Sequence, residues 1–399
     1  MVDERAPLLL SSPRNAPNLL RKHVSLVATD EPLGFFRSLW NAVRSEFSSI
    51  MLVFVPLGFL AYHLGWGDKL IFIFNFMAII PLAALLGKST EEIGCRTSQS
   101  IAGLLNATFG NAVELIVGII ALQANLLDVV KASLLGSIIS NLLLVFGMAC
   151  FFGGLKFKVQ KFSVDAAGTT SSLLSLTVLG VLLPAAITAG GGESTPALTE
   201  EVLKISRYTS VIILFMYFAF LYFQLVTHKD SFESVEDEET ADVATMSLPA
   251  ALFLLCAVTV LVSFSADYLV GSIEAVSEEW GLPRTFIGII LLPIVGNAAE
   301  HVTAIIVAMK NKMNLALAVV IGSSLQIAMS VIPVLVLAGW IMGRDLGLNF
   351  KLEQSVVLFM STLLVNLIDQ DGASNWLEGL MLISAYVIVA ICFFFHNSY

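Results

Sequence analysis

Two glutamates stand alone in long apolar stretches of the sequence, each within the same short motif. Residues 110–114 read GNAVE and residues 296–300 read GNAAE, so Glu114 and Glu300 lie 186 positions apart. The stretch from Ile101 to Leu122 contains no other charged residue. A charged side chain at the centre of a bilayer costs about 2.5–3.5 kcal/mol on insertion scales, so an acid at that depth usually serves a function. The two motifs are therefore the first candidates for a binding site.

The residues before each glutamate could shape such a site. In each motif the glycine and the asparagine precede the glutamate by four and three positions, which on a continuous helix places all three near one face. These residues are Gly110 and Asn111 in the first motif and Gly296 and Asn297 in the second. Glycine lets backbones approach closely, and Pro293 favours a break in its helix. We therefore expect unwound backbone beside the acids, where it can line a cavity or bind an ion.

Hydroxyl and amide side chains occur in the apolar stretch that follows each motif. They are Ser137, Ser140 and Asn141 in the first half and Ser323, Ser324 and Gln326 in the second. With the carboxylates they form a set of oxygen ligands without thiolates or paired histidines, and Ca²⁺ takes about 6–8 such oxygens. Zinc and copper prefer nitrogen or sulfur, and Mg²⁺ dehydrates reluctantly. We therefore expect Ca²⁺ as the bound ion, with Mn²⁺ as an open alternative and no resident cofactor.

The same two carboxylates suggest a coupling ion. Carboxylates that share a low-dielectric site repel each other and resist ionisation. A bound divalent cation cancels both charges, and in its absence protonation of both groups restores neutrality. The site would thus hold either one Ca²⁺ or about two protons, which is the competition that antiport requires.

The composition is that of a membrane protein. The chain has 399 residues, of which 57% are hydrophobic and 13% charged, and its mean hydropathy is +0.87. A soluble domain has roughly 25% charged residues. We expect no nucleic-acid binding, because no basic patch occurs outside the flanks of the apolar stretches. No nucleophile and base are arranged as in an enzyme, so no enzymatic activity is expected.

Eleven apolar stretches approach the length of about 20 residues that a helix needs to cross a bilayer. They lie near residues 50–66, 70–87, 100–122, 132–153, 167–189, 207–227, 248–271, 284–309, 314–340, 354–369 and 375–395. The expected fold class is therefore all-α, a polytopic membrane protein with eleven transmembrane helices.

An internal repeat relates the two halves of the chain. At the offset of 186 positions the two motifs coincide, and further on Gly136 and Ser137 meet Gly322 and Ser323. Two units of five helices result, and an odd number of crossings inverts the second unit, as in many secondary transporters. The expected parts are a tail at 1–48, an extra helix at 49–68, the first repeat at 69–228, an acidic loop at 229–246 and the inverted repeat at 247–399.

The charge distribution predicts the orientation. With a cytosolic N-terminus, fourteen of the 21 lysines and arginines lie in cytosolic segments, in agreement with the positive-inside rule. The C-terminus then lies on the opposite, lumenal side. The polar, proline-containing tail is expected to be a disordered cytosolic arm. Between Lys229 and Asp242 there are seven acids and one base, which is typical of a disordered, solvated loop.

The sequence resembles the fungal vacuolar Ca²⁺/H⁺ exchangers of the cation/Ca²⁺ exchanger superfamily. The similar stretches are NATFGNAVELIVGIIAL from Asn106, PIVGNAAEHVTAIIVAMK from Pro293, LGSIISN from Leu135 and IGSSLQIA from Ile321. The resemblance implies an eleven-helix fold in the vacuolar membrane that moves cytosolic Ca²⁺ inward in exchange for lumenal H⁺. It implies Glu114 and Glu300 as the principal ligands. The residues implied to supply or orient the other ligands are Asn111, Asn297, Ser137, Ser323 and Gln326.

Several alternatives stay open at this point. Na⁺-driven Ca²⁺ exchangers resemble this fold but carry Gly-Thr-Ser-type motifs, whereas both motifs here read Gly-Asn-Ala. A cation channel commonly needs a ring of carboxylates or carbonyls from several subunits, which single acids do not build. His301 could relay protons or pack in the core. Glu91, Glu92 and Glu274 could line the ion's access path or lie at solvated helix ends.

Overall fold

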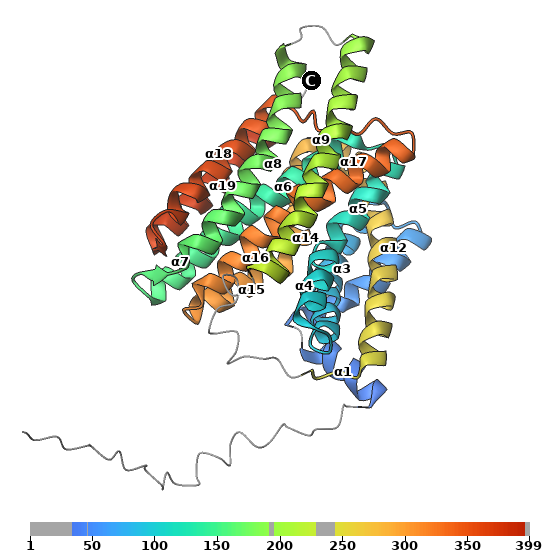
Figure 1. Cartoon of the computed structure of the whole chain (residues 1–399). Coiled ribbons are helices and arrows are strands. Elements are labelled where there is room, and N and C mark those ends of the chain that lie inside the picture. Colours follow the sequence, from blue (N-terminus) through green and yellow to red (C-terminus); the bar gives the residue numbers. More distant parts are fainter. Residues whose placement is uncertain (1–33, 46, 191–194, 229–243, 396–399) are drawn as a thin grey trace, which may run out of the picture.

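The chain folds into a bundle of helices, and a computed structural model describes residues 34–45, 47–190, 195–228 and 244–395 (Figure 1). The first half contains α1 (Phe35–Ser45), η1 (Phe47–Val53), α2 (Phe54–His63), α3 (Asp68–Gly94), α4 (Gln99–Phe109), α5 (Ala112–Gln123), α6 (Leu127–Ile139), η2 (Ser140–Val145), α7 (Phe146–Lys156), α8 (Val164–Gly190), α9 (Pro196–Tyr222) and η3 (Phe223–Thr227). The second half contains α12 (Leu248–Trp280), α13 (Arg284–Phe286), η4 (Ile287–Leu291), α14 (Leu292–Gly296), α15 (Ala298–Met309), α16 (Met313–Gln326), η5 (Ile327–Val331), α17 (Ile332–Ile341), α18 (Leu352–Asp369) and α19 (Trp376–Phe395). Segment η1 is a 3₁₀ helix, and η2 to η5 are π-helical.

Eight of the described helices are long and apolar enough to cross a membrane, or up to ten if each bent pair is one span. Each of the eleven stretches expected from the sequence overlaps a helical segment. Three helices extend well beyond the expected stretches: α3 runs from Asp68 to Gly94, α9 begins at Pro196, and α12 continues to Trp280. The all-α membrane fold is confirmed. The count of eleven crossings and the inverted relation of the halves stay predictions.

Local signals explain where several helices begin and end. Thr195 accepts a hydrogen bond from Leu198 N at the start of α9, and Pro196 occupies the first turn, where no backbone donor is needed. At the end of α12, Gly281 adopts a left-handed conformation with φ of +64°. A residue with a side chain rarely adopts this conformation, so glycine ends the helix here at low cost.

The helices form two groups with a buried layer between them. In Figure 1, α3, α4 and α12 lie on one side, α7, α8, α18 and α19 lie on the other, and α6, α14 and α16 lie between. The span from Leu127 to Lys156 is the most enclosed, with 83% of its apolar window buried, against 22% in α19. A two-residue antiparallel ladder joins Gln160–Lys161 to Ala373–Ser374 at one end. The central α6 is therefore the scaffold on which a site between the groups is built.

The segment expected to be a disordered tail contains a helix. Residues 1–33 lie outside the described part of the chain, as does most of the acidic loop (229–243). Residues 35–45, by contrast, form α1, which packs against α12. The expectation of a disordered arm through residue 48 is therefore wrong for α1, because this segment has apolar residues at helical spacing that the polar character of the tail as a whole concealed.

Candidate cation-binding site

Both GNAxE motifs lie at breaks between two helices. Gly110 and Asn111 separate α4 from α5, and Asn297 separates α14 from α15, whose axes are bent by 56°. The φ and ψ angles are −113° and 29° at Asn111 and −87° and 14° at Asn297, close to the sparsely populated bridge region. The expectation that the glycine, asparagine and glutamate of each motif share the face of one continuous helix is therefore wrong, whereas the break expected near Pro293 is present. The second break also lies four residues after Pro293, whose carbonyl accepts from Asn297 N at 2.9 Å.

The breaks place each glutamate at the start of a new helix. Glu114 lies in the first turn of α5 and Glu300 in the first turn of α15. The free N–H groups and the positive end of the helix dipole favour a carboxylate there. Glu114 Oε1 and Glu300 Oε2 are nonetheless inaccessible to solvent and have no hydrogen-bond partner among the described residues. A buried acceptor left without a partner costs about 1–3 kcal/mol, so each oxygen is placed to receive a proton or a cation.

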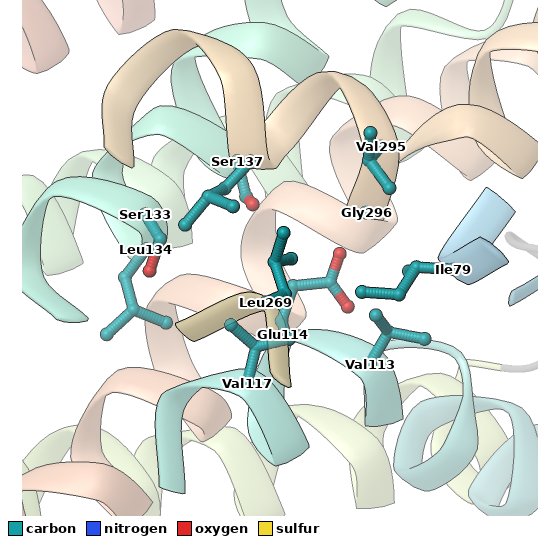
Figure 2. A pocket seen from close by; sticks show the side chains of 11 residues that line it. Ile79, Val113, Glu114, Val117, Ser133, Leu134, Ser137, Leu269, Val295 and Gly296 are labelled. Carbon is teal, nitrogen blue, oxygen red and sulfur yellow. The ribbon is translucent and has the colours of Figure 1, made fainter. Parts of the chain in front are cut away.

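A small cavity of about 30 Å³ lies beside Glu114. Its walls come from α3, α5, α6, α12 and α14 and are lined by Ile79, Val113, Glu114, Val117, Ser133, Leu134, Ser137, Leu269, Leu292, Val295 and Gly296. Figure 2 shows the Glu114 carboxylate lying below Gly296, with Ile79 and Val113 beside it and Ser137 across the cavity. A Cβ atom at Gly296 would lie 2.9 Å from Glu114 Oε1, so the carboxylate of one motif fits against the backbone of the other only because residue 296 is glycine.

The two glutamates interact across the halves of the chain. The Glu114 and Glu300 carboxylates are close enough to repel each other electrostatically. In the described part of the chain, neither has a salt bridge to a basic side chain. Two buried acids without a basic partner are stable together only if protons or a cation neutralise them. The pair therefore has the charge required for a divalent cation.

A hydrogen-bonded cluster of four side chains holds the first break against the second half. Asn111 Nδ2 donates to Gln326 Oε1 at 2.6 Å, and Ser323 Oγ donates to Asn111 Oδ1 at 3.0 Å. Asn141 Nδ2 donates to Ser323 Oγ at 3.1 Å. Gly110 lies next to this cluster, because a Cβ atom at residue 110 would be 3.6 Å from Gln326 Oε1. Asn111 makes no hydrogen bond to its own helix, so its side chain is free to make this connection.

The second break is held by a different contact. Asn297 Nδ2 donates to the backbone carbonyl of Ser137 at 3.0 Å, while Asn297 Oδ1 is buried and has no partner among the described residues. His301 Nδ1 lies 2.5 Å from the backbone oxygen of Asn297, and its buried Nε2 has no partner in the described part. The two roles considered for His301, proton relay and core packing, remain open, and its ring turns towards the break.

A π-helical segment follows the polar residues on both α6 and α16. Segment η2 begins at Ser140 and η5 begins at Ile327, directly after Gln326. Short π-helical stretches inside α-helices are rare and occur frequently at functional sites. Their positions nearly follow the 186-residue offset of the repeat. The sequence contains no proline or glycine at either start that would have predicted them.

The structure gathers the nine candidate residues into connected groups and adds new ones. Of these candidates, Glu114, Ser137 and Gly296 line the cavity. Ser323 and Gln326 do not line it and instead contact Asn111, and the other residues that lie outside the lining are Glu300, Asn297, Asn111 and Gly110. The sequence interpretation missed Ser133, which also lines the cavity. It stands four positions before Ser137 and so on the same face of α6, a spacing that could have revealed it. It also missed the apolar walls from α3 and α12, for which the sequence contains no local signal.

Glu92 has neither of the roles considered for it. It is 7% exposed, and its carboxylate accepts hydrogen bonds from Thr245 N and Met246 N, both at 2.9 Å. Arg96 donates to the carbonyl of Met246 from the same helix end. The C-terminal end of α3 therefore binds residues 245–246, which lead into α12. The interpretations of Glu92 as part of an access path or as a solvated helix end are both wrong.

Comparison with known proteins identifies the family. The sodium/calcium exchanger protein family matches residues 69–226 and 250–395. The chain is 43% identical to a vacuolar calcium ion transporter of Schizosaccharomyces pombe, over 98% of this chain and 93% of that protein. It is 45% identical to a Ca²⁺/H⁺ antiporter of Synechocystis, over 90% and 99%.

Solved structures agree with this result. The crystal structure of the Ca²⁺/H⁺ antiporter YfkE superposes with a TM-score of 0.73 at 36% identity, covering 90% of this chain and all of that one. The two family-matched segments contain both helix breaks and both glutamates, one in each segment. The chain belongs to the sodium/calcium exchanger protein family.

Proposed function

We propose that this protein is a secondary antiporter that exchanges Ca²⁺ for H⁺ across a vacuolar membrane. The observation that carries the proposal is the pair Glu114 and Glu300, two acids at helix breaks that repel each other and each keep a buried oxygen without a partner. One Ca²⁺ or about two protons would neutralise the pair. The names of the S. pombe and Synechocystis relatives support this exchange.

The remaining candidates then act around the two acids. Ser137 and Gly296 line the cavity, and Asn297 Oδ1 is buried without a partner among the described residues. Under this proposal the oxygens of these three residues complete the coordination. Gly110, Asn111, Ser323 and Gln326 position the first break from the other half. Neutral oxygen donors of this kind suit a Ca²⁺ ion that needs more ligands than two carboxylates supply.

The architecture that would move the ion is the predicted inverted repeat, with parts at 69–228 and 247–399 joined by the acidic loop. Each half contributes one helix break, one glutamate and a π-helical segment that follows α6 or α16, which is η2 in the first half and η5 in the second. Under this proposal the site lies near the midplane and opens to one side at a time. The N-terminus is cytosolic and the C-terminus lumenal. Ca²⁺ leaves the cytosol as H⁺ leaves the acidic lumen.

Sodium-driven exchange is the second candidate because the family also takes its name from sodium. Sodium coupling needs additional carboxylates or hydroxyls beside the acids. In the described part of the chain each break carries one acid in the first turn of its second helix. The two acids alone suffice for protons, so proton coupling is favoured.

Sealed proteoliposomes with an acidic interior test the proposal. Ca²⁺ uptake should occur in wild-type protein, collapse with a protonophore and be indifferent to sodium. Glu114→Gln and Glu300→Gln should abolish it. Glu200→Gln is the matched control, because Glu200 is exposed and pairs only with Lys204. Normal uptake in either site variant would refute the assignment of Glu114 and Glu300 as ligands. Sodium-dependent uptake in wild-type protein would show that sodium, and not H⁺, is the coupling ion.

A further inference from the structure

Helix α1 is attached to the bundle along one face only. Ser38 and Ala42 are 0% and 1% exposed, and Leu39 beside them is partly buried. Ser38 Oγ accepts a hydrogen bond from Ser247 N at 3.1 Å, and the Phe35 ring contacts that of Phe253 with centroids 5.6 Å apart. Both partners belong to the beginning of α12. This contact fixes how α1 is rotated about its own axis.

The two other faces of α1 are exposed and differ in chemistry. Phe36 and Trp40, one turn apart, are 83% and 66% exposed and form an apolar stripe. Arg37 and Arg44, two turns apart, are also exposed and form a basic stripe next to it. The helix therefore presents a protein-facing side, an apolar side and a cationic side in succession around its axis.

The orientation of α1 matches a position at the membrane surface. Its axis is bent by 107° from that of the following helical segment, Ser49–His63, so the two are nearly perpendicular. In Figure 1, α1 lies at the lower end of the α12 helix, which is long enough to span a bilayer. The sequence predicts that residues 50–66 cross the bilayer, and a helix nearly perpendicular to a crossing helix lies close to the plane of the interface.

The exposed apolar stripe is continuous with surface that must face lipid. Ile50 in η1 is 86% exposed, and Phe253 at the start of α12 is 55% exposed. Both lie next to α1 along the chain or in contact with it. The apolar stripe thus extends the lipid-facing surface of the spans, while the arginines lie at its boundary.

We propose that α1 is an interfacial helix that binds anionic phospholipid headgroups through Arg37 and Arg44, with Phe36 and Trp40 inserted at the edge of the acyl chains. Aromatic side chains favour this depth of the membrane. Basic side chains near an anionic surface are attracted to it. The lipid is recognised by charge and depth, on the membrane face from which the N-terminal residues emerge.

Lipid bound at α1 would also position the start of α12. Ser247 is bonded to Ser38, and the two residues before it are held by Glu92 at the end of α3. Helices α3 and α12 supply Ile79 and Leu269 to the cavity wall. Anchoring α1 therefore fixes one end of the two helices that cover Glu114.

Quenching of Trp40 fluorescence tests the insertion. Full-length protein is reconstituted into vesicles of phosphatidylcholine and phosphatidylserine, some of them brominated near the top of the acyl chains. The signal of Trp40 is the difference between wild-type and Trp40→Phe protein. Quenching by the brominated lipid and not by aqueous iodide is expected. The opposite pattern would show that this face of α1 lies in water, and it would overturn the proposal.

Removal of the arginine charges tests headgroup binding. Each basic residue near an anionic surface changes local affinity by about fivefold, the equivalent of about 1 kcal/mol. In Arg37→Gln/Arg44→Gln protein, half-maximal Trp40 quenching should therefore need at least about fivefold more phosphatidylserine. Arg37→Lys/Arg44→Lys, which keeps both charges, should behave like wild type. An unchanged phosphatidylserine dependence in the glutamine variant would refute the role of the arginines, and this result is independent of Ca²⁺ transport.

Discussion

Asn111 Nδ2 donates to Gln326 Oε1 over 2.6 Å, joining the first helix break to the end of α16 in the other half of the chain. The reciprocal contact runs from Asn297 to the backbone oxygen of Ser137 on α6. Each break is thus held by the polar helix of the opposite half. An ion bound between the two halves of the chain can change their arrangement only if its site contacts both halves. The side chains of Asn111 and Asn297 make these contacts.

Gly296→Ala should impair transport without unfolding the protein. The new Cβ would lie 2.9 Å from Glu114 Oε1, and this separation requires the carboxylate to move. Because Glu114 is the proposed ligand, we expect at least about a tenfold rise in the half-saturating Ca²⁺ concentration, equivalent to about 1.4 kcal/mol. Ca²⁺ uptake into proteoliposomes measures it.

Gly322→Ala is the matched control for that experiment. A Cβ at Gly322 meets nothing within 4 Å, and both glycines are helical residues near the site. Alanine also has the higher helix propensity. Gly322→Ala should therefore transport like wild type. If both variants had equal half-saturating Ca²⁺ concentrations, the close approach of Gly296 to Glu114 would have no functional meaning.

The contact between Asn111 and Gln326 should appear as an energetic coupling. Asn111→Ala leaves Gln326 Oε1 without its donor and the Ser323 hydroxyl without its acceptor, at a cost of about 1–3 kcal/mol. Gln326→Ala should cost less in the Asn111→Ala background than in wild type, with a coupling of about 0.5–3 kcal/mol. Ca²⁺ binding to the four proteins of this double-mutant cycle measures the coupling. Additive effects would show that the two side chains act independently.

The sequence predicts the acids of this site better than it predicts the backbone that presents them. Glu114 and Glu300 are recognisable because an isolated charge in an apolar stretch is costly to bury and is rarely retained without a function. The helix breaks are not visible in the same way, since glycine and asparagine are tolerated within membrane helices that pack closely. The sequence interpretation therefore placed Gly110 and Asn111 on a continuous helical face, whereas they separate α4 from α5. Only the second break had a local signal, which was Pro293.

Contacts between distant segments were the other part that the sequence could not provide. The neighbours of Asn111 lie more than 200 positions away, and nothing in the local pattern selects Ser323 over Ser324 as its partner. Glu92 was similarly misjudged, because its partners at 245–246 follow the acidic loop and include two main-chain amides beside the Thr245 hydroxyl. Every residue except proline has a backbone donor, so the sequence does not show which donors bind a carboxylate. From the sequence alone, a buried carboxylate bound to backbone N–H groups cannot be distinguished from one at a solvated helix end.

Glu92→Gln should destabilise the protein. The carboxylate accepts from Thr245 N, Met246 N and the Thr245 hydroxyl, and a neutral amide with a single oxygen replaces these charge-assisted hydrogen bonds by fewer and weaker ones. The loss should amount to about 1–3 kcal/mol, as for other buried groups left unsatisfied, and lower the midpoint of thermal unfolding in detergent. Glu201→Gln, at an exposed site on α9, should leave the midpoint unchanged. An unchanged midpoint in Glu92→Gln would contradict the role of this carboxylate as a clamp.

Acidification should weaken Ca²⁺ binding. The slope of the logarithm of the dissociation constant against pH gives the number of protons that one Ca²⁺ displaces. If both carboxylates are protonated in the absence of Ca²⁺, binding one ion releases two protons, and the dissociation constant rises about hundredfold for each unit of decreasing pH. Equilibrium dialysis of purified protein against radiolabelled Ca²⁺ over a series of pH values measures the slope. Because Glu300→Gln removes one titrating acid, its weaker residual binding should follow a slope near tenfold per unit. Binding that does not vary with pH in wild-type protein would show that Glu114 and Glu300 do not exchange Ca²⁺ for protons.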